Sequence, residues 1–253
     1  MASSLSKPIA IVAGAGPGTG AAIAHRFAKA YSVVLLARTQ ANLVPLAQSI
    51  HQNGGSALAI SADVTNADAI DSTMTQIKTH FGRDVSVAAA IFNVASKFTR
   101  KPFLDSNAEF LDSLEATARG ASNFSKAVIP SMVREAKNSE QQYPPTLIFT
   151  GATAAMKGGP GLGSFAMSKF AVRALSQSLA REFGPQGVHV AHAIIDGIIA
   201  TEKTKDYNKD RPDSKIDPDS RKRTGSYTLS QDLLLLMSLT SDLIPIAADT
   251  DED

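Results

Sequence analysis

Residues 8–20 read PIAIVAGAGPGTG, and this stretch decides the fold. The apolar residues 9–12 are typical of a buried strand, and the residues AAIAHRFA after the stretch place Ile23 and Phe27 on one helical face. Glycine lets the backbone turn tightly and approach a ligand closely, and N–H groups at a helix start favour negative charge. The sequence therefore predicts a phosphate cradle, formed by four glycines: Gly14, Gly16, Gly18 and Gly20.

Strands and helices alternate along the rest of the chain. The segments with apolar runs predict strands over residues 32–38, 56–64, 85–95, 146–150 and 188–195. The segments with helical periodicity predict helices over residues 40–53, 66–81, 107–137 and 164–183. Continuous apolar strands are expected where both faces of a sheet are covered. The pattern predicts one α/β domain with a doubly wound parallel sheet.

The composition narrows the classes of function. The chain has 253 residues, 43% of them hydrophobic, which is enough for the core of one domain. Its formal net charge of +1 gives no electrostatic case for binding nucleic acid or an anionic membrane. The absence of cysteine excludes disulfides and thiolate metal sites. The first strand begins near residue 8 and the longest apolar run covers only residues 233–237, so we expect a cytoplasmic protein without a signal peptide or membrane span.

Short motifs follow the expected strands in a fixed order. The glycines at 14, 18 and 20 have the spacing Gly-x-x-x-Gly-x-Gly, and the later motifs are Asp63-Val64, Asn93-Val94-Ala95, Gly151, Ser168-Lys169 and Asp196-Gly197 through Thr201. With these motifs, residues 7–201 resemble the short-chain dehydrogenase/reductase family. The resemblance implies a Rossmann-type NAD(P)-binding domain over residues 1–253 and an oxidoreductase that acts on a small molecule.

The end of the second strand bears on the choice of cofactor. Proteins that bind NAD usually have a carboxylate here for the ribose diol, and this carboxylate would repel a 2′-phosphate. The sequence has Ala37 instead, followed by Arg38 and Thr39. A guanidinium can bind a phosphate with two hydrogen bonds, which favours NADP(H), although a solvated surface arginine is the alternative. The resemblance implies further contacts to the adenine, the riboses and the nicotinamide from Asp63, Val64, Asn93, Lys169, Ile199 and Thr201.

The catalytic positions depart from the family pattern. Most members use Asn, Ser, Tyr and Lys, and their tyrosine gives the proton to the carbonyl oxygen. Here Phe165 stands four residues before Lys169, while Ala152 and Thr117 stand at the serine and asparagine positions. Phenylalanine cannot donate a proton, so ordinary alcohol–ketone interconversion is not expected.

Three interpretations remain open from the sequence. The first is an NADPH-dependent oxidoreductase in a biosynthetic side pathway, which reduces an iminium or an activated carbonyl compound. Hydride addition to an iminium gives a neutral amine directly and needs no acid. The second is a cyclase or isomerase that uses the same pocket without redox chemistry. The third is a catalytically inactive NADP-binding protein, since function depends on sites rather than folds.

Replacement catalytic groups are candidates beside Lys169. Asp196 ends the sixth strand, where a partly buried carboxylate would have a raised pKa and act as an acid, or bind a cation. Its alternative role is to cap the following turn. Thr153 would supply a hydroxyl, with an ordinary surface role as the alternative. His189 and His192 are three residues apart on a strand and would face opposite sides, which argues against a shared metal.

The C-terminal part of the chain fits the family less well. Residues 202–223 are highly charged and contain two prolines, and the family resemblance implies a mobile lid over the substrate here. Residues 224–253 form a divergent tail that matches the family's last strand poorly. Because that strand usually builds the oligomer interface, assembly into a homo-oligomer stays open.

Overall fold

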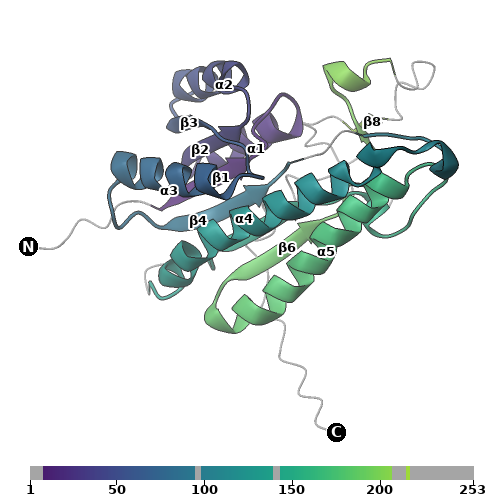
Figure 1. The fold of residues 1–253 in the computed structure, drawn as a ribbon. Coiled ribbons are helices and arrows are strands. Elements are labelled where there is room, and N and C mark those ends of the chain that lie inside the picture. Colours follow the sequence, from purple (N-terminus) through teal and green to yellow (C-terminus); the bar gives the residue numbers. More distant parts are fainter. Residues whose placement is uncertain (1–7, 95–97, 139–142, 207–214, 217–253) are drawn as a thin grey trace, which may run out of the picture.

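A parallel sheet forms the centre of the computed structural model, which describes residues 8–94, 98–138, 143–206 and 215–216. Six strands are hydrogen-bonded in the order β3-β2-β1-β4-β5-β6 (Figure 1). Their bounds are β1 (Ile9–Ala13), β2 (Ser32–Ala37), β3 (Ala57–Ser61), β4 (Val87–Phe92), β5 (Thr146–Thr150) and β6 (His189–Ala193). The strand order reverses between β1 and β4, which places a ligand crevice at the carboxyl ends of these strands. The predicted doubly wound α/β sheet is confirmed.

Helices cover both faces of the sheet (Figure 1). They are α1 (Thr19–Phe27), α2 (Gln40–Gln52), α3 (Ala67–Phe81), α4 (Asp112–Glu135) and α5 (Gly163–Phe183). Successive strand side chains point to opposite faces, so β1 sends Ile9 and Ile11 toward α3, α4 and α5. The same strand sends Ala10 and Val12 toward α1 and α2. All five residues of β1 are buried, which explains why the sequence of this strand is apolar throughout.

The helix expected over residues 107–137 begins later than predicted. Two short 3-10 helices, Phe103–Asp105 and Ala108–Phe110, precede it, and α4 starts only at Asp112. The Asn107 side chain accepts a 3.2 Å hydrogen bond from the Glu109 N–H, which closes a separate turn ahead of the helix. Three further 3-10 helices connect other elements: Thr153–Ala155, Gly184–Gln186 and Glu202–Thr204.

Two short strands pair with each other, one just before the expected lid (residues 202–223) and one inside it. They are β7 (Ile198–Ile199) and β8 (Lys215–Ile216), which pair in parallel, and the Ala200 N–H donates to the Ile216 carbonyl at 2.7 Å. Residues 207–214 and 217–223 of the expected lid lie outside the described residues, as do Ala95 and the tail 224–253.

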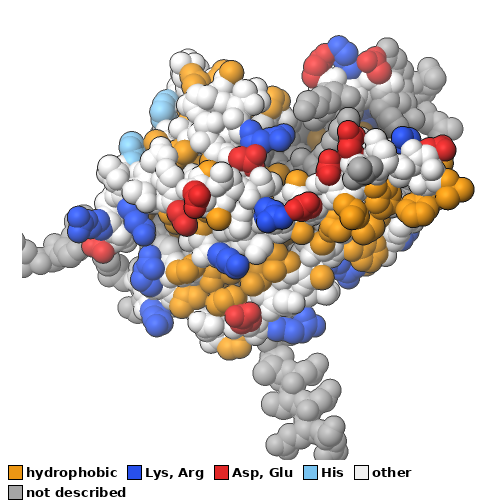
Figure 2. All heavy atoms as spheres, viewed as in Figure 1, with side chains coloured by type: hydrophobic (Ala, Val, Ile, Leu, Met, Phe, Trp, Pro, Cys, Tyr) orange, Lys and Arg blue, Asp and Glu red, His pale blue; other side chains and the backbone are white. Residues whose placement is uncertain are grey.

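Apolar side chains gather on the molecular face formed by α4 and α5 (Figure 2). The exposed apolar residues of this part of the chain include Leu111, just before α4, and Met167 and Phe170 on α5. No helix in the described ranges is both long and apolar enough to cross a membrane. Because these apolar residues are exposed, the face of α4 and α5 is partly open to solvent in the single chain.

Candidate active site

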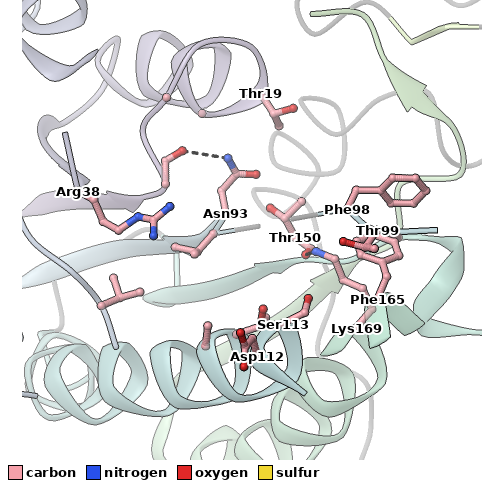
Figure 3. A pocket seen from close by; sticks show the side chains of 18 of the residues that line it. Thr19, Arg38, Asn93, Phe98, Thr99, Asp112, Ser113, Thr150, Phe165 and Lys169 are labelled. Atoms are coloured by element: carbon pink, nitrogen blue, oxygen red, sulfur yellow. Dashed lines mark hydrogen bonds between the residues drawn. The ribbon is translucent and has the colours of Figure 1, made fainter. Parts of the chain in front are cut away.

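A cavity of about 1220 Å³ opens at the carboxyl edge of the sheet (Figure 3). Its wall is built from the glycine loop after β1 and from the residues that follow β2, β3, β4, β5 and β6. The first turns of α4 and α5 complete it. This is the crevice that the reversal of strand order predicts. Eleven residues expected to bind the cofactor line it: Gly14, Gly16, Gly20, Arg38, Thr39, Asp63, Val64, Asn93, Lys169, Ile199 and Thr201.

The glycine loop leaves room for a ligand at one position and is tightly packed at others. A Cβ atom added to Gly20 would lie 2.2 Å from the Gly14 carbonyl oxygen, so glycine is needed to bring the helix start against the strand end. A Cβ added to Gly16 would meet nothing within 4 Å, because this glycine faces the open cavity. No side chain caps the start of α1. The loop therefore fits a dinucleotide pyrophosphate.

Gly18 has a different role from the other three glycines. It is not among the residues that line the cavity. Its φ is +91°, and an added Cβ would lie 2.7 Å from the Thr201 Cγ2 atom. Gly18 thus allows the chain after β6 to approach the glycine loop, and the expected contact of Gly18 with a ligand stays a prediction.

One end of the cavity lies beyond β2 and β3. The Asp63 carboxylate accepts hydrogen bonds from the Thr65 N–H at 2.9 Å and from the Thr65 hydroxyl at 2.8 Å. These two bonds, and then the nearby positive charge of Arg38, lower the pKa of Asp63 below its usual value. Arg38 and Thr39 are exposed on the cavity wall, where a phosphate can reach them.

Asn93 joins the end of β4 to the glycine loop. Its N–H donates to the Ala13 carbonyl at 2.8 Å, and its Nδ2 donates to the Gly14 carbonyl at 3.1 Å (Figure 3). The side chain is thereby fixed beside the loop. The nearby Val64 carbonyl accepts a 3.0 Å hydrogen bond from the Asn123 side chain, which fixes the segment after β3.

Lys169 projects from α5 into the cavity and is 5% exposed. Its Nζ donates to the Thr150 carbonyl oxygen at 3.3 Å and lies 5.8 Å from the ring centroid of Phe165. Burial lowers the pKa of Lys169 to about 8. Within the described ranges, no carboxylate forms a salt bridge with this amine. Phe165 in turn contacts Phe98 edge-on, with ring centroids 5.1 Å apart.

The three altered positions come together with Lys169. Thr117, Ala152 and Phe165 all line the same cavity, although they are far apart in the sequence. The Thr117 hydroxyl is buried without a hydrogen-bond partner, and so is the hydroxyl of Thr150. A buried polar atom without a partner is costly, so each marks a place where a bound molecule would supply one.

The other two catalytic candidates lie elsewhere. The Thr153 hydroxyl donates to the Asp196 carboxylate, and neither residue lines the cavity. Asp196 is exposed, so the expectation of a partly buried acid is wrong. The preceding Ile195 takes the cavity-facing place instead, because neighbouring side chains in extended backbone point to opposite sides. Asp196 instead accepts from Thr153, the first residue of the 3-10 helix Thr153–Ala155, and its alternative role as a cap of the turn that follows it stays a prediction.

The two histidines of β6 are not part of a cluster of potential metal ligands among the described residues. No group of three His, Asp or Glu side chains with metal-binding geometry exists in the described part of the chain. His192 packs against Gly151, where an added Cβ would lie 2.3 Å from its Cε1 atom. Burial, and then the charges of Arg173 and Lys169, lower the pKa of His192 to about 4, so the imidazole is neutral at physiological pH.

Several cavity residues escaped the reasoning from sequence. Thr150 ends β5, and the rule that placed Asn93 at a strand end would have found it. Phe98 lies in an irregular loop, and nothing in the sequence indicated its place. The other missed residues at the substrate end include Thr99, Lys101, Glu109, Phe110, Asp112, Ser113, Ser164 and Glu202.

Comparison with known proteins agrees with this architecture. Residues 8–212 match the family model described as short chain dehydrogenase. A short-chain dehydrogenase/reductase of Armillaria gallica is 32% identical over 198 residues, covering 76% of this chain and 71% of the relative. The fold is similar to that of a metagenomic short-chain oxidoreductase in complex with NADP, with a TM-score of 0.71, 21% identity, and coverage of 96% and 94%. It is also similar to NAD⁺-bound xylitol dehydrogenase, with a TM-score of 0.70, 23% identity, and coverage of 78% and 73%.

Proposed function

This chain belongs to the short-chain dehydrogenase/reductase family of oxidoreductases, and we propose that it is an NADPH-dependent member with a non-standard set of catalytic residues. Its substrate in this proposal is a small organic iminium or activated carbonyl compound. The observation that carries the proposal is the pairing of Phe165 with Lys169 at the cavity wall. The phenyl ring of Phe165 cannot donate a proton, whereas the neighbouring amine of Lys169 is retained.

NADP(H) is supported by the charges at the adenosine end. Arg38 follows β2 where Ala37 replaces an acidic residue, and both line the cavity. A 2′-phosphate would gain charge-assisted hydrogen bonds from the guanidinium. One structure of similar fold contains NADP and another contains NAD⁺, so the support comes from Arg38 rather than from the fold.

In this proposal, different residues bind different parts of the cofactor. The open backbone at Gly16 and the start of α1 would receive the pyrophosphate, and Lys169 would bind the nicotinamide ribose. Ile199 and Thr201 would contact the nicotinamide end. When bound, the reduced nicotinamide supplies a hydride. Of the three catalytic candidates, only Lys169 lines the cavity, so the proposal gives the catalytic role to Lys169 alone.

The lining around Phe165 favours a substrate with an apolar portion. Phe98 and Phe165 form an aromatic corner, and Phe110 also lines the cavity. An iminium carbon that accepts hydride becomes part of a neutral amine, so it needs no acid from the protein. We place this activity in the cytoplasm and in a biosynthetic side pathway as part of the same proposal.

The test is a turnover screen that follows consumption of NADPH and of NADH. Cyclic iminium salts, α-diketones and unactivated ketones are offered to the wild-type protein at equal concentrations. We expect oxidation of NADPH with the first two classes and little with the third. Tight NADPH binding without turnover of any substrate would instead favour a non-redox or inactive NADP-binding protein. Failure to bind either nucleotide would reject both the NADPH-dependent oxidoreductase and the inactive NADP-binding protein.

A further inference from the structure

We propose that the Thr150 hydroxyl and the Lys169 amine together bind the oxygen atom of a carbonyl substrate, and that Lys169 gives this oxygen its proton. The inference rests on the proposed function and assigns an activated carbonyl compound as a substrate. It adds to the site a residue, Thr150, at a strand end that the sequence did not single out.

The Lys169 amine contacts residue Thr150 through the backbone carbonyl of that residue. Thr150 is the last residue of β5, and Lys169 reaches it from α5, with its Nζ 3.3 Å from the Thr150 carbonyl oxygen (Figure 3). Both residues line the cavity. A substrate oxygen placed between them would meet a hydroxyl and an ammonium at once.

Both groups have unused hydrogen-bonding capacity. The Thr150 hydroxyl is buried and has no partner. An ammonium has three N–H donors. The Lys169 ammonium has a single recorded acceptor, the Thr150 carbonyl. Hydrogen-bond donors that face a cavity and have free capacity stabilise a negative charge as it develops on a substrate oxygen.

Of the described side chains recorded in contact with the Lys169 amine, none offers a second proton donor. Phe165 offers only the face of its ring to Lys169, and Ala152 has no polar group. The Thr117 hydroxyl lines the same cavity, but the structure records no contact between it and Lys169. The amine is therefore the acidic group best placed for a carbonyl oxygen near Thr150.

The reaction balances with a reduced nicotinamide dinucleotide as the reductant. The carbonyl carbon accepts a hydride, and the electron pair of the C=O π bond moves to oxygen. The oxygen takes a proton from the Lys169 ammonium, which gives an alcohol, an oxidised dinucleotide and a neutral amine. The amine regains a proton from water before the next turnover.

The electrostatic surroundings suit this role. Burial lowers the pKa of Lys169 to about 8, which makes the ammonium a better acid than an exposed lysine. His192 of β6 is neutral near this pH, and Arg173 lies one turn further along α5. Four carboxylates line the cavity: Glu109, Asp112 and Glu202 are exposed, and the half-buried Asp63 is hydrogen-bonded to Thr65.

The first experiment removes only the hydroxyl, in Thr150→Val. We expect kcat for an α-diketone to fall by about tenfold to hundredfold, while kcat for a cyclic iminium stays within about twofold because the iminium has no oxygen to bind. The matched control is Thr146→Val, at the other end of the same strand and outside the cavity. NADPH binding, measured by fluorescence, should be the same in all three proteins.

The second experiment needs no turnover. 4-Nitrophenol serves as a probe, because its absorbance distinguishes the phenol from the phenolate, a mimic of the substrate oxyanion. We expect the wild-type protein to bind the phenolate form, and Thr150→Val and Lys169→Met to bind it at least about tenfold more weakly. Lys126→Met, an exposed lysine of α4, is the control for loss of a positive charge.

The outcomes separate this inference from the proposed function. Equal phenolate binding by wild type and Thr150→Val would overturn the inference, and so would iminium turnover with no carbonyl turnover. Weaker phenolate binding by both variants would support the oxygen site even if no substrate in the screen were reduced, a result that would count against the proposed function alone.

Discussion

The amine of Lys169 lies over the ring of Phe165, with 5.8 Å between Nζ and the ring centroid. The two residues are one helical turn apart on α5, and both line the cavity at the carboxyl edge of the sheet. An aromatic ring attracts a cation to its face, so the contact partly offsets the cost of burying the ammonium. The pairing leaves the amine, rather than a phenol, as the acidic group of the site.

Phe165→Tyr should introduce ketone reductase activity. The new phenol would stand one helical turn from Lys169, whose positive charge lowers a phenol pKa and favours proton donation. We expect NADPH oxidation with unactivated ketones to rise by at least about tenfold, as measured by loss of nicotinamide absorbance. Phe170→Tyr, an exposed position on the same helix, is the control. An unchanged rate would mean that the cavity positions the ketone elsewhere.

Arg38→Ala should reduce selectivity for NADPH. A hydrogen bond to a charged group is worth about 1.5–3 kcal/mol, so the Kd for NADPH should rise roughly tenfold to hundredfold. The Kd for NADH should change little, because NADH has no 2′-phosphate. Fluorescence titration measures both constants, and Arg83→Ala, an exposed arginine outside the cavity, serves as the control. An equal loss of affinity for NADPH and NADH would show that the substitution disturbs the whole cofactor site.

Gly16→Ala and Gly20→Ala should separate ligand binding from folding. At Gly20 an added Cβ would overlap the Gly14 carbonyl, so we expect a loss of about 3 kcal/mol in the free energy of unfolding. At Gly16 the space is open, so the unfolding free energy should be unchanged while NADPH affinity falls. Urea denaturation and nucleotide titration of both variants provide the measurements. Full NADPH affinity in Gly16→Ala would argue against pyrophosphate binding there.

Lys169→Met should raise stability in a pH-dependent way. The folded pKa of about 8 lies below the ordinary lysine pKa of 10.5, so the unfolded chain binds more protons between these pH values. Wild-type stability therefore rises through this window relative to the variant. The advantage of Lys169→Met should be greatest below pH 8, at up to about 3 kcal/mol, and decrease toward pH 10.5. Urea denaturation across this pH range tests the prediction. A difference in unfolding free energy between the two proteins that does not change with pH would contradict a buried, desolvated Lys169.

The apolar face on α4 and α5 should support self-association. Met167 and Phe170 are 41% and 43% exposed on this face, and large exposed apolar patches often mark protein interfaces. We expect a homo-oligomer by size-exclusion chromatography with light scattering. Phe170→Asp should shift it toward the monomer, whereas Val44→Asp, an exposed apolar residue of α2, should not. A monomeric wild-type protein would exclude the interface.

The reasoning from sequence succeeded where local pattern and topology act together. Arg38 was expected in the site because it stands at the end of a parallel strand, and Asn93 because of the family resemblance; both line the cavity at the edge where the strand ends meet. The same reasoning failed for Asp196, because it did not establish which of two neighbouring residues faces the cavity. Ile195 takes that place, and Asp196 bonds to Thr153 outside it.

The sequence by itself determined the parallel sheet, the glycine loop and the absence of a phenol before Lys169. Apolar runs, helical periodicity and glycine spacing are local properties of the sequence, so they do not depend on how distant segments pack. Only the tertiary structure decided that Thr117, Thr150 and Phe98 share one cavity with Lys169, and that the Thr150 hydroxyl is buried without a partner. Such contacts join residues distant in sequence, and they depend on how helices and loops pack across the sheet.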